Sequence, residues 1–266
     1  MVRYNAKLQR IARAVKRDID EVIVPLVKQY APDYVQDATP THDGWADTIG
    51  RALQFLTGKW LSPIVRQAAE SIASDFVRTQ IKTNARGNKS VGIDVFSESQ
   101  QMRDYLEAAT FQNAMLITSI PAQYLEQVQN LVMTNMRAGM RPSFIEKALQ
   151  EQFGVTQRRA KMIARDQTAK VAGEINKRRQ IATGFSYFKW SDSKDQRVRH
   201  RHREIADKVT EYGPGVYRWD NLPLSDKGEP IAPGQDYQCR CVAIAVPDFK
   251  VERYKRDGQT APGVTR

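Results

Sequence analysis

The sequence predicts an α+β fold, with a mainly helical N-terminal region followed by a small, loop-rich C-terminal module that contains β-strands. Apolar residues recur with helical spacing over most of the chain up to Gly184. Beyond Gly184, apolar and polar residues alternate as in strands, and glycine and proline become frequent. Two of the three histidines and both cysteines lie in this last part. The residue types most able to bind or react are therefore concentrated in the C-terminal module.

Length and composition limit the class of protein. A chain of 266 residues, 41% hydrophobic and 27% charged, is typical of one large or two modest globular domains. No apolar run approaches the ~20 residues of a membrane helix, and the N-terminus lacks the pattern of a secretory signal. Two cysteines separated by one residue are no disulfide framework, which indicates an intracellular origin. The net charge of +11 favours a polyanionic partner such as nucleic acid. The alternative is a generally basic surface.

The first predicted helix carries an apolar stripe from Leu8 to Ile23, and Pro25 is expected to break or kink it. Its basic residues lie largely off the stripe, so this face can contact a membrane, DNA or a partner, or can simply face solvent. Residues 31–44 read as a loop that contains the isolated His42. Helical spacing returns from Trp45 to about residue 81, with a division near Ser62.

Capping signals divide the middle of the chain. Ser97 predicts the start of a helix that ends near residue 117, and Pro121 predicts the start of the next one, which ends at Gly139. A short helix follows and ends at Gly154, and Thr156 begins a long helix up to Gly184. An alternative interpretation of residues 144–168 is a helix-turn-helix DNA reader, although its second helix would be unusually long. Its phosphate-facing side chains would be Arg158, Arg159, Lys161 and Arg165.

The C-terminal module is expected to hold strands at residues 185–190, 216–219 and 239–246, joined by glycine- and proline-rich loops. The basic segment that follows is predicted to be an arm or disordered. The domain boundaries predicted in this way are 1–140 for the helical region, 141–249 for the C-terminal module with its preceding helices, and 250–266 for the tail.

Rare side chains in this module define a candidate site. Cys239 and Cys241 would project from one face of a strand, and His202 can add an imidazole, so zinc is one interpretation. The single residue between the cysteines departs from the usual spacing of two to four. The alternative without a cofactor is a pair of half-buried thiols beside a hydrogen-bonded histidine.

Catalysis and structural support are competing interpretations of the acidic and basic residues. Asp195 and His202, close to arginines, could serve a nuclease or toxin-like enzyme. No second signature supports an enzyme, since phosphate-binding glycine loops and paired carboxylates are missing from the sequence. In the structural alternative, which assigns no catalytic residue, Asp195 accepts paired hydrogen bonds from Arg197 or Arg199. Trp190 and Trp219 then supply the core of the module.

The order of these motifs resembles a family of phage proteins. The order runs from Gly154-Val155-Thr156 and Ile163-Ala164-Arg165 through a long helix to Trp190, Asp195-x-Arg197-x-Arg199-x-x-His202 and Cys239-Arg240-Cys241. It is similar to the head-morphogenesis family of tailed bacteriophages, which includes the Mu protein F-like and SPP1 minor head proteins. The resemblance covers about residues 143–248. Arg165-Asp166-Gln167-Thr168 departs from the family's usual Arg-Thr-Glu, and His200 is extra.

The resemblance implies a minor head protein that acts at the portal vertex in head assembly, DNA packaging or ejection. Its expected partners are the portal protein, the major capsid protein or scaffold, and packaged double-stranded DNA bound without sequence reading. Its expected location is the host cytoplasm during assembly and then the head interior or portal vertex of the virion, with no membrane contact during assembly. The resemblance makes the Asp195–His202 and Cys239–Cys241 motif a family trait that is structural or metal-binding.

Overall fold

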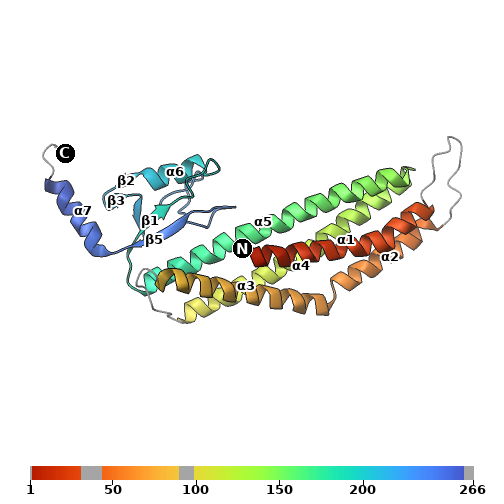
Figure 1. The fold of residues 1–266 in the computed structure, drawn as a ribbon, viewed down its shortest axis with the longest axis horizontal. Coiled ribbons are helices and arrows are strands. Elements are labelled where there is room, and N and C mark those ends of the chain that lie inside the picture. The colour runs from red at the N-terminus through yellow and green to blue at the C-terminus, as the bar shows by residue number, and fades with distance from the viewer. Residues whose placement is uncertain (1, 31–43, 90–98, 261–266) are drawn as a thin grey trace. The chain divides into compact units, whose positions relative to one another are not determined.

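The computed structural model describes residues 2–30, 44–89 and 99–260 and confirms the α+β fold class (Figure 1). Five long helices come first: α1 (Val2–Tyr30), α2 (Trp45–Trp60), α3 (Pro63–Lys89), α4 (Gln100–Arg137) and α5 (Pro142–Ala182). The later elements are shorter: β1 (Tyr187–Ser191), α6 (His200–Asp207), β2 (Val209–Thr210), β3 (Gly213–Pro214), β4 (Val216–Arg218), β5 (Val242–Val246) and α7 (Asp248–Thr260). His42 and residues 90–98 and 261–266 lie outside the described ranges.

The chain divides into two compact units that alternate along the sequence. The first unit comprises residues 1–76 and 110–165, and the second comprises residues 77–109 and 166–266. The core of the first unit is formed by apolar side chains from α1, α2, α4 and α5, among them Val15, Ile19, Leu53, Val128 and Leu149. The boundaries predicted at residues 140 and 250 separate regions of different expected function, so they stay a prediction.

The helix break predicted at Pro121 is wrong, and of the break or kink expected at Pro25 the break is wrong. α1 continues through Pro25 to Tyr30, and α4 continues through Pro121. Each proline removes one backbone donor, but buried apolar residues lie on both sides of it, such as Ile120 and Tyr124 around Pro121. Burial of these side chains offsets the lost hydrogen bond. Other predicted boundaries are confirmed: α2 and α3 are separated at residues 61–62, and Gly139 and Gly184 follow helices with positive φ.

The helix-turn-helix interpretation is also wrong. α5 runs without interruption from Pro142 to Ala182, so Gly154 and Thr156 lie inside one helix where a turn was expected. The Thr156 hydroxyl donates to the Gln152 carbonyl within the helix. A glycine inside a helix costs roughly 1 kcal/mol relative to alanine, which the burial of Leu149, Ala160 and Ile163 along the same helix exceeds.

The second unit contains a three-stranded antiparallel sheet in the order β4-β1-β5 and the short ladder β2-β3. β1 alternates as its sequence predicts, with Phe188 and Trp190 buried and Lys189 exposed. In α5, Asn176 and Gln180 donate side-chain hydrogen bonds to the Ala243 carbonyl of β5, at 2.7 and 3.1 Å. The C-terminal half of α5 is thereby fastened to the edge strand.

The tail that follows the sheet is not disordered over its described part. Residues 248–260 form α7, with Val251 buried. The Lys255 ammonium lies 4.9 Å from the Tyr212 ring centre. The alternative of a disordered segment is therefore wrong up to residue 260.

Candidate functional site

Three buried side chains from two separate segments meet in the second unit. His202 lies in the first turn of α6, and its Nδ1 is 3.5 Å from the Sγ atoms of both Cys239 and Cys241. The three side chains are 4%, 2% and 5% exposed. The sequence placed the cysteines on a strand, but they precede β5, which begins at Val242. His202 and the two cysteines therefore meet as predicted. The loop that carries the cysteines contains Gln238 with φ 55°.

The other imidazole nitrogen is held by a carboxylate. His202 Nε2 lies 3.2 Å from Asp236 Oδ2, and Arg199 lies 3.0 Å from the same oxygen. The negative charge of Asp236 favours a proton on the nearby Nε2, which leaves the lone pair of Nδ1 directed at the two sulfurs. His200, two residues earlier, is 87% exposed at its side chain and pairs with Glu204 outside this cluster.

The thiols and the imidazole shift one another's pKa. Hydrogen bonding to Cys241 and then to His202 lowers the pKa of Cys239, while the neighbouring Cys239 raises the pKa of Cys241. The hydrogen bond to Cys239 raises the pKa of His202 against the effect of burial. A negative charge on one sulfur therefore disfavours a second negative charge on the other.

Asp195 is bound by a residue that the sequence interpretation did not assign to it. Both terminal guanidinium nitrogens of Arg240 donate to the Asp195 carboxylate, and the backbone N–H of Arg197 donates to it at 2.9 Å. The expected partners Arg197 and Arg199 do not supply the bidentate pair; Arg199 instead binds Asp236. The Arg240 bonds are the main cause that lowers the pKa of Asp195 to about 2.

α5 holds the loop that carries the cysteines. Asp166 is 7% exposed and accepts the backbone N–H of Gln238 at 2.8 Å. Further along α5, a Cβ on Gly173 would lie 2.7 Å from the Pro233 carbonyl oxygen, so only glycine permits this close approach. Sequence reasoning missed both Asp236 and Asp166. The short separation of Asp236 from Cys239 was the one available signal, whereas nothing local connects Asp166 with residue 238.

An aromatic core supports this cluster. Trp190 is 1% exposed, and its ring lies edge-on to His202 with centres 5.4 Å apart. Phe188 stacks on Trp219 at 4.0 Å. The cysteines and Ile205 belong to the same cluster of buried residues. The structure therefore places Trp190 and Trp219 in the core, as the sequence predicted.

A second feature is a pair of basic stripes on α1 and α5 in the first unit. Gln9 donates to the Gln157 carbonyl at 2.8 Å, and Lys28 pairs with Glu146, so these helix segments lie side by side and antiparallel (Figure 1). Each helix turns its buried residues toward the shared core and its cations away from it. We call these cations the basic face: Arg3, Arg10, Arg13, Arg17, Arg158, Lys161 and Arg165.

The residues of the basic face are available to a ligand. They are exposed, apart from the half-buried Arg165, and in the described ranges none forms an ion pair with a carboxylate. Arg159 differs from the other predicted DNA contacts. It donates to the Ser119 hydroxyl at 2.8 Å, and burial lowers its pKa. We therefore assign Arg159 to the packing of α4 against α5.

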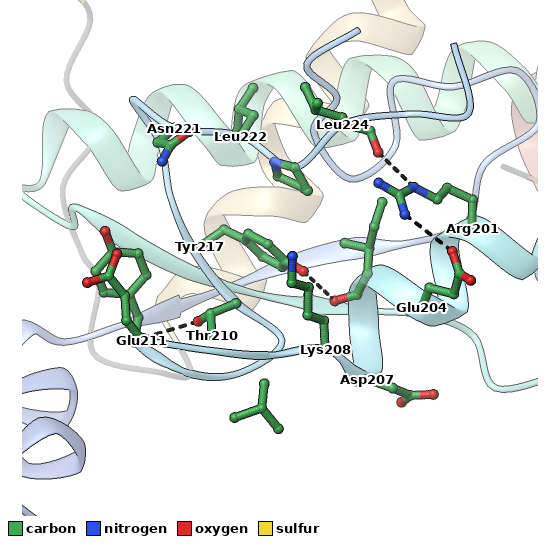
Figure 2. Close-up of a pocket in the computed structure, with 14 residues that line it drawn as sticks. Arg201, Glu204, Asp207, Lys208, Thr210, Glu211, Tyr217, Asn221, Leu222 and Leu224 are labelled. Atoms are coloured by element: carbon green, nitrogen blue, oxygen red, sulfur yellow. Dashed lines mark hydrogen bonds and ion pairs between the residues drawn. The ribbon is translucent and has the colours of Figure 1, made fainter. Parts of the chain in front are cut away.

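The second unit also has a pocket of about 910 Å³ between α6, β2 and residues 217–224. In Figure 2 its polar groups bind one another: Arg201 donates to Glu204 and the Leu224 carbonyl, and Tyr217 donates to the Ile205 carbonyl. None of the predicted site residues lines it.

Comparison with known proteins confirms the predicted resemblance. Residues 126–244 match the family described as Phage Mu protein F like protein. This segment is similar to the Mu F-like family. It contains α5, the sheet strands β1 and β4, and all three members of the His202–cysteine cluster. The match indicates a phage head protein and, with it, a place in the virion.

The relatives add little about activity. An "Uncharacterized protein" of Haemophilus influenzae is 28% identical over 253 residues, which is 92% of this chain and 53% of that protein. The chain thus spans about half the length of the curated relative it matches. No solved structure matches. No helix in the described part of the chain is long and apolar enough to cross a membrane.

Proposed function

We propose that this protein is a minor head protein of a tailed phage, which acts at the portal vertex and contacts packaged double-stranded DNA through the basic face. The Mu F-like match supports the assignment to the head. The basic face is the observation that supports DNA contact. Its cations occupy two adjacent antiparallel helices and have no acidic partners among the residues that the structure describes, an arrangement that suits a phosphate backbone better than base edges.

A non-catalytic role for the Asp195–His202 motif is part of the proposal. Asp195 is bound by Arg240, and His202 is buried with contacts at both nitrogens. A general base needs a free lone pair within reach of a substrate proton. The engaged groups support a structural use of the motif over a nuclease. Plasmid that stays intact with the chain and added divalent metal is the expected result.

A charge-matched pair of variants tests the DNA contact. Arg10, Arg13 and Arg17 are changed to glutamine in one variant, and the exposed α3 cations Arg66, Lys82 and Arg86 in the other. Both variants lose the same net charge. If the basic face binds phosphates, only the first should weaken binding to random duplexes and should reduce the slope of log affinity against log salt by about 2–3. Equal slopes in the two variants would refute the proposed interface.

The head assignment has a separate test. The chain should co-purify with portal protein, or with capsid or scaffold, from cells that assemble the phage head. A chain that is recovered only free of these proteins, while heads form and package DNA normally without it, would contradict the role at the portal vertex.

A further inference from the structure

We propose that His202, Cys239 and Cys241 form a binding site for a zinc ion. The ligand atoms would be the Nδ1 of His202 and the two cysteine Sγ atoms, which all lie within 4.8 Å of one another. This inference rests on side-chain geometry and does not depend on the proposed role in the phage head.

The distances agree with a shared central ion. Zn–S and Zn–N bonds of about 2.3 and 2.0–2.1 Å at tetrahedral angles place a sulfur and a nitrogen about 3.5 Å apart. Nδ1 lies 3.5 Å from both sulfurs. A hydrogen bond explains such symmetry poorly, because the single lone pair of Nδ1 cannot accept well from two thiols at once. A metal ion on the nitrogen lone pair contacts all three atoms together.

The surrounding residues also suit a metal. Asp236 Oδ2 lies 3.2 Å from Nε2 of His202, and its negative charge favours a proton on Nε2 and so strengthens Nδ1 as a ligand. Two thiolates and one imidazole balance the charge of a divalent ion, and soft sulfur ligands favour zinc over magnesium or calcium. Arg240 is turned to Asp195, so its charge is compensated there.

The ion would fasten two segments that are far apart in sequence. His202 belongs to α6, whereas Cys239 and Cys241 belong to the loop before β5. The strands of this unit have at most five residues each, so a metal cross-link adds stability that the small sheet alone supplies poorly. Three protein ligands occur in the described cluster, so one of the four tetrahedral positions has no ligand among the described residues.

Metal analysis of the full-length chain without a histidine tag tests the site. After incubation with zinc and desalting, wild type should hold about one zinc per chain, and His202→Ala and Cys241→Ser should hold less than about a tenth of that. His200→Ala is the matched control, because this histidine is exposed and lies two residues from the ligand. Metal-free wild type, or equal zinc in His202→Ala and His200→Ala, would overturn the site.

Two further measurements stay informative if His202→Ala or Cys241→Ser fails to fold. Cobalt added to the wild-type chain should give a thiolate charge-transfer band that equimolar zinc removes, and a folded chain without the band would overturn the proposal. Asp236→Asn should fold, retain the ligands and bind zinc about 10–100-fold more weakly in a chelator competition. Unchanged zinc affinity in this variant would contradict the positioning role of Asp236.

Discussion

Trp190 is the largest fully buried side chain, and its truncation tests whether the aromatic core holds the candidate site together. A buried tryptophan removes about 150–250 Å² from water, worth about 4–6 kcal/mol at 25 cal/mol per Å². This is an upper value, because the unfolded chain already buries part of this area. We expect Trp190→Ala to lower the stability of the second unit by about 3–5 kcal/mol.

Hydrogen exchange gives the appropriate readout, because a chain with two compact units need not unfold in one step. Amides of β1, β4 and β5 should lose protection in Trp190→Ala, and Trp190→Phe should lose less because it keeps a ring beside His202. Phe55→Ala, at a side chain that is 67% exposed, should change stability by no more than about 0.5 kcal/mol. Unchanged protection of the three strands in Trp190→Ala would refute the reasoning.

Three further predictions concern the supports of the site. Gly215→Ala should destabilise the second unit by at least about 1–3 kcal/mol in urea unfolding, because φ is +68° and the new Cβ would lie 2.4 Å from the Ala206 carbonyl oxygen; wild-type stability would contradict this. Asp166→Ala should cost about 1–3 kcal/mol by leaving the Gln238 N–H without its acceptor, which a wild-type melting temperature would disprove. The pKa of Asp195 is about 2 when folded, so its stabilising effect is complete above the ordinary value of 3.8 and is lost as pH falls toward 2. Asp195→Asn should flatten this acid dependence in a pH series of melts, and an unchanged series would contradict it.

The sequence predicted the order of helices and strands better than the places where helices end. Pro121 and Gly154 are strong local signals for a break, yet each lies inside a helix of 38 and 41 residues, respectively. Local preferences of about 1–3 kcal/mol decide a boundary only where packing is neutral. The buried residues on both sides of Pro121 and Gly154 favour continuity, and that long-range contribution cannot be read from the flanking residues alone.

In the candidate site, too, the sequence predicted which rare residues meet but not which distant charged residues pair with one another. The meeting of His202 with the cysteines could be predicted because these residue types are rare and lie in one module, and the structure brings them together. The contacts of Asp195 with Arg240 and of Asp236 with His202 span 45 and 34 positions, so local pairing rules pointed to the nearer arginines instead. The positions of charged partners depended on the register of the loop before β5, which the sequence pattern alone does not determine.

That register gives a physical reason for the unusual Cys-Arg-Cys spacing. In this segment the sulfurs of Cys239 and Cys241 both lie near His202, while the side chain of Arg240 between them binds Asp195. Asp195 lies between β1 and α6, and His202 lies in the first turn of α6, so the two belong to one continuous stretch of chain. Three consecutive residues therefore hold that stretch at two places, once through an imidazole and once through a carboxylate. The wider spacing of common zinc motifs would give up this double attachment, because a second intervening residue would turn one cysteine away from His202 or Arg240 away from Asp195.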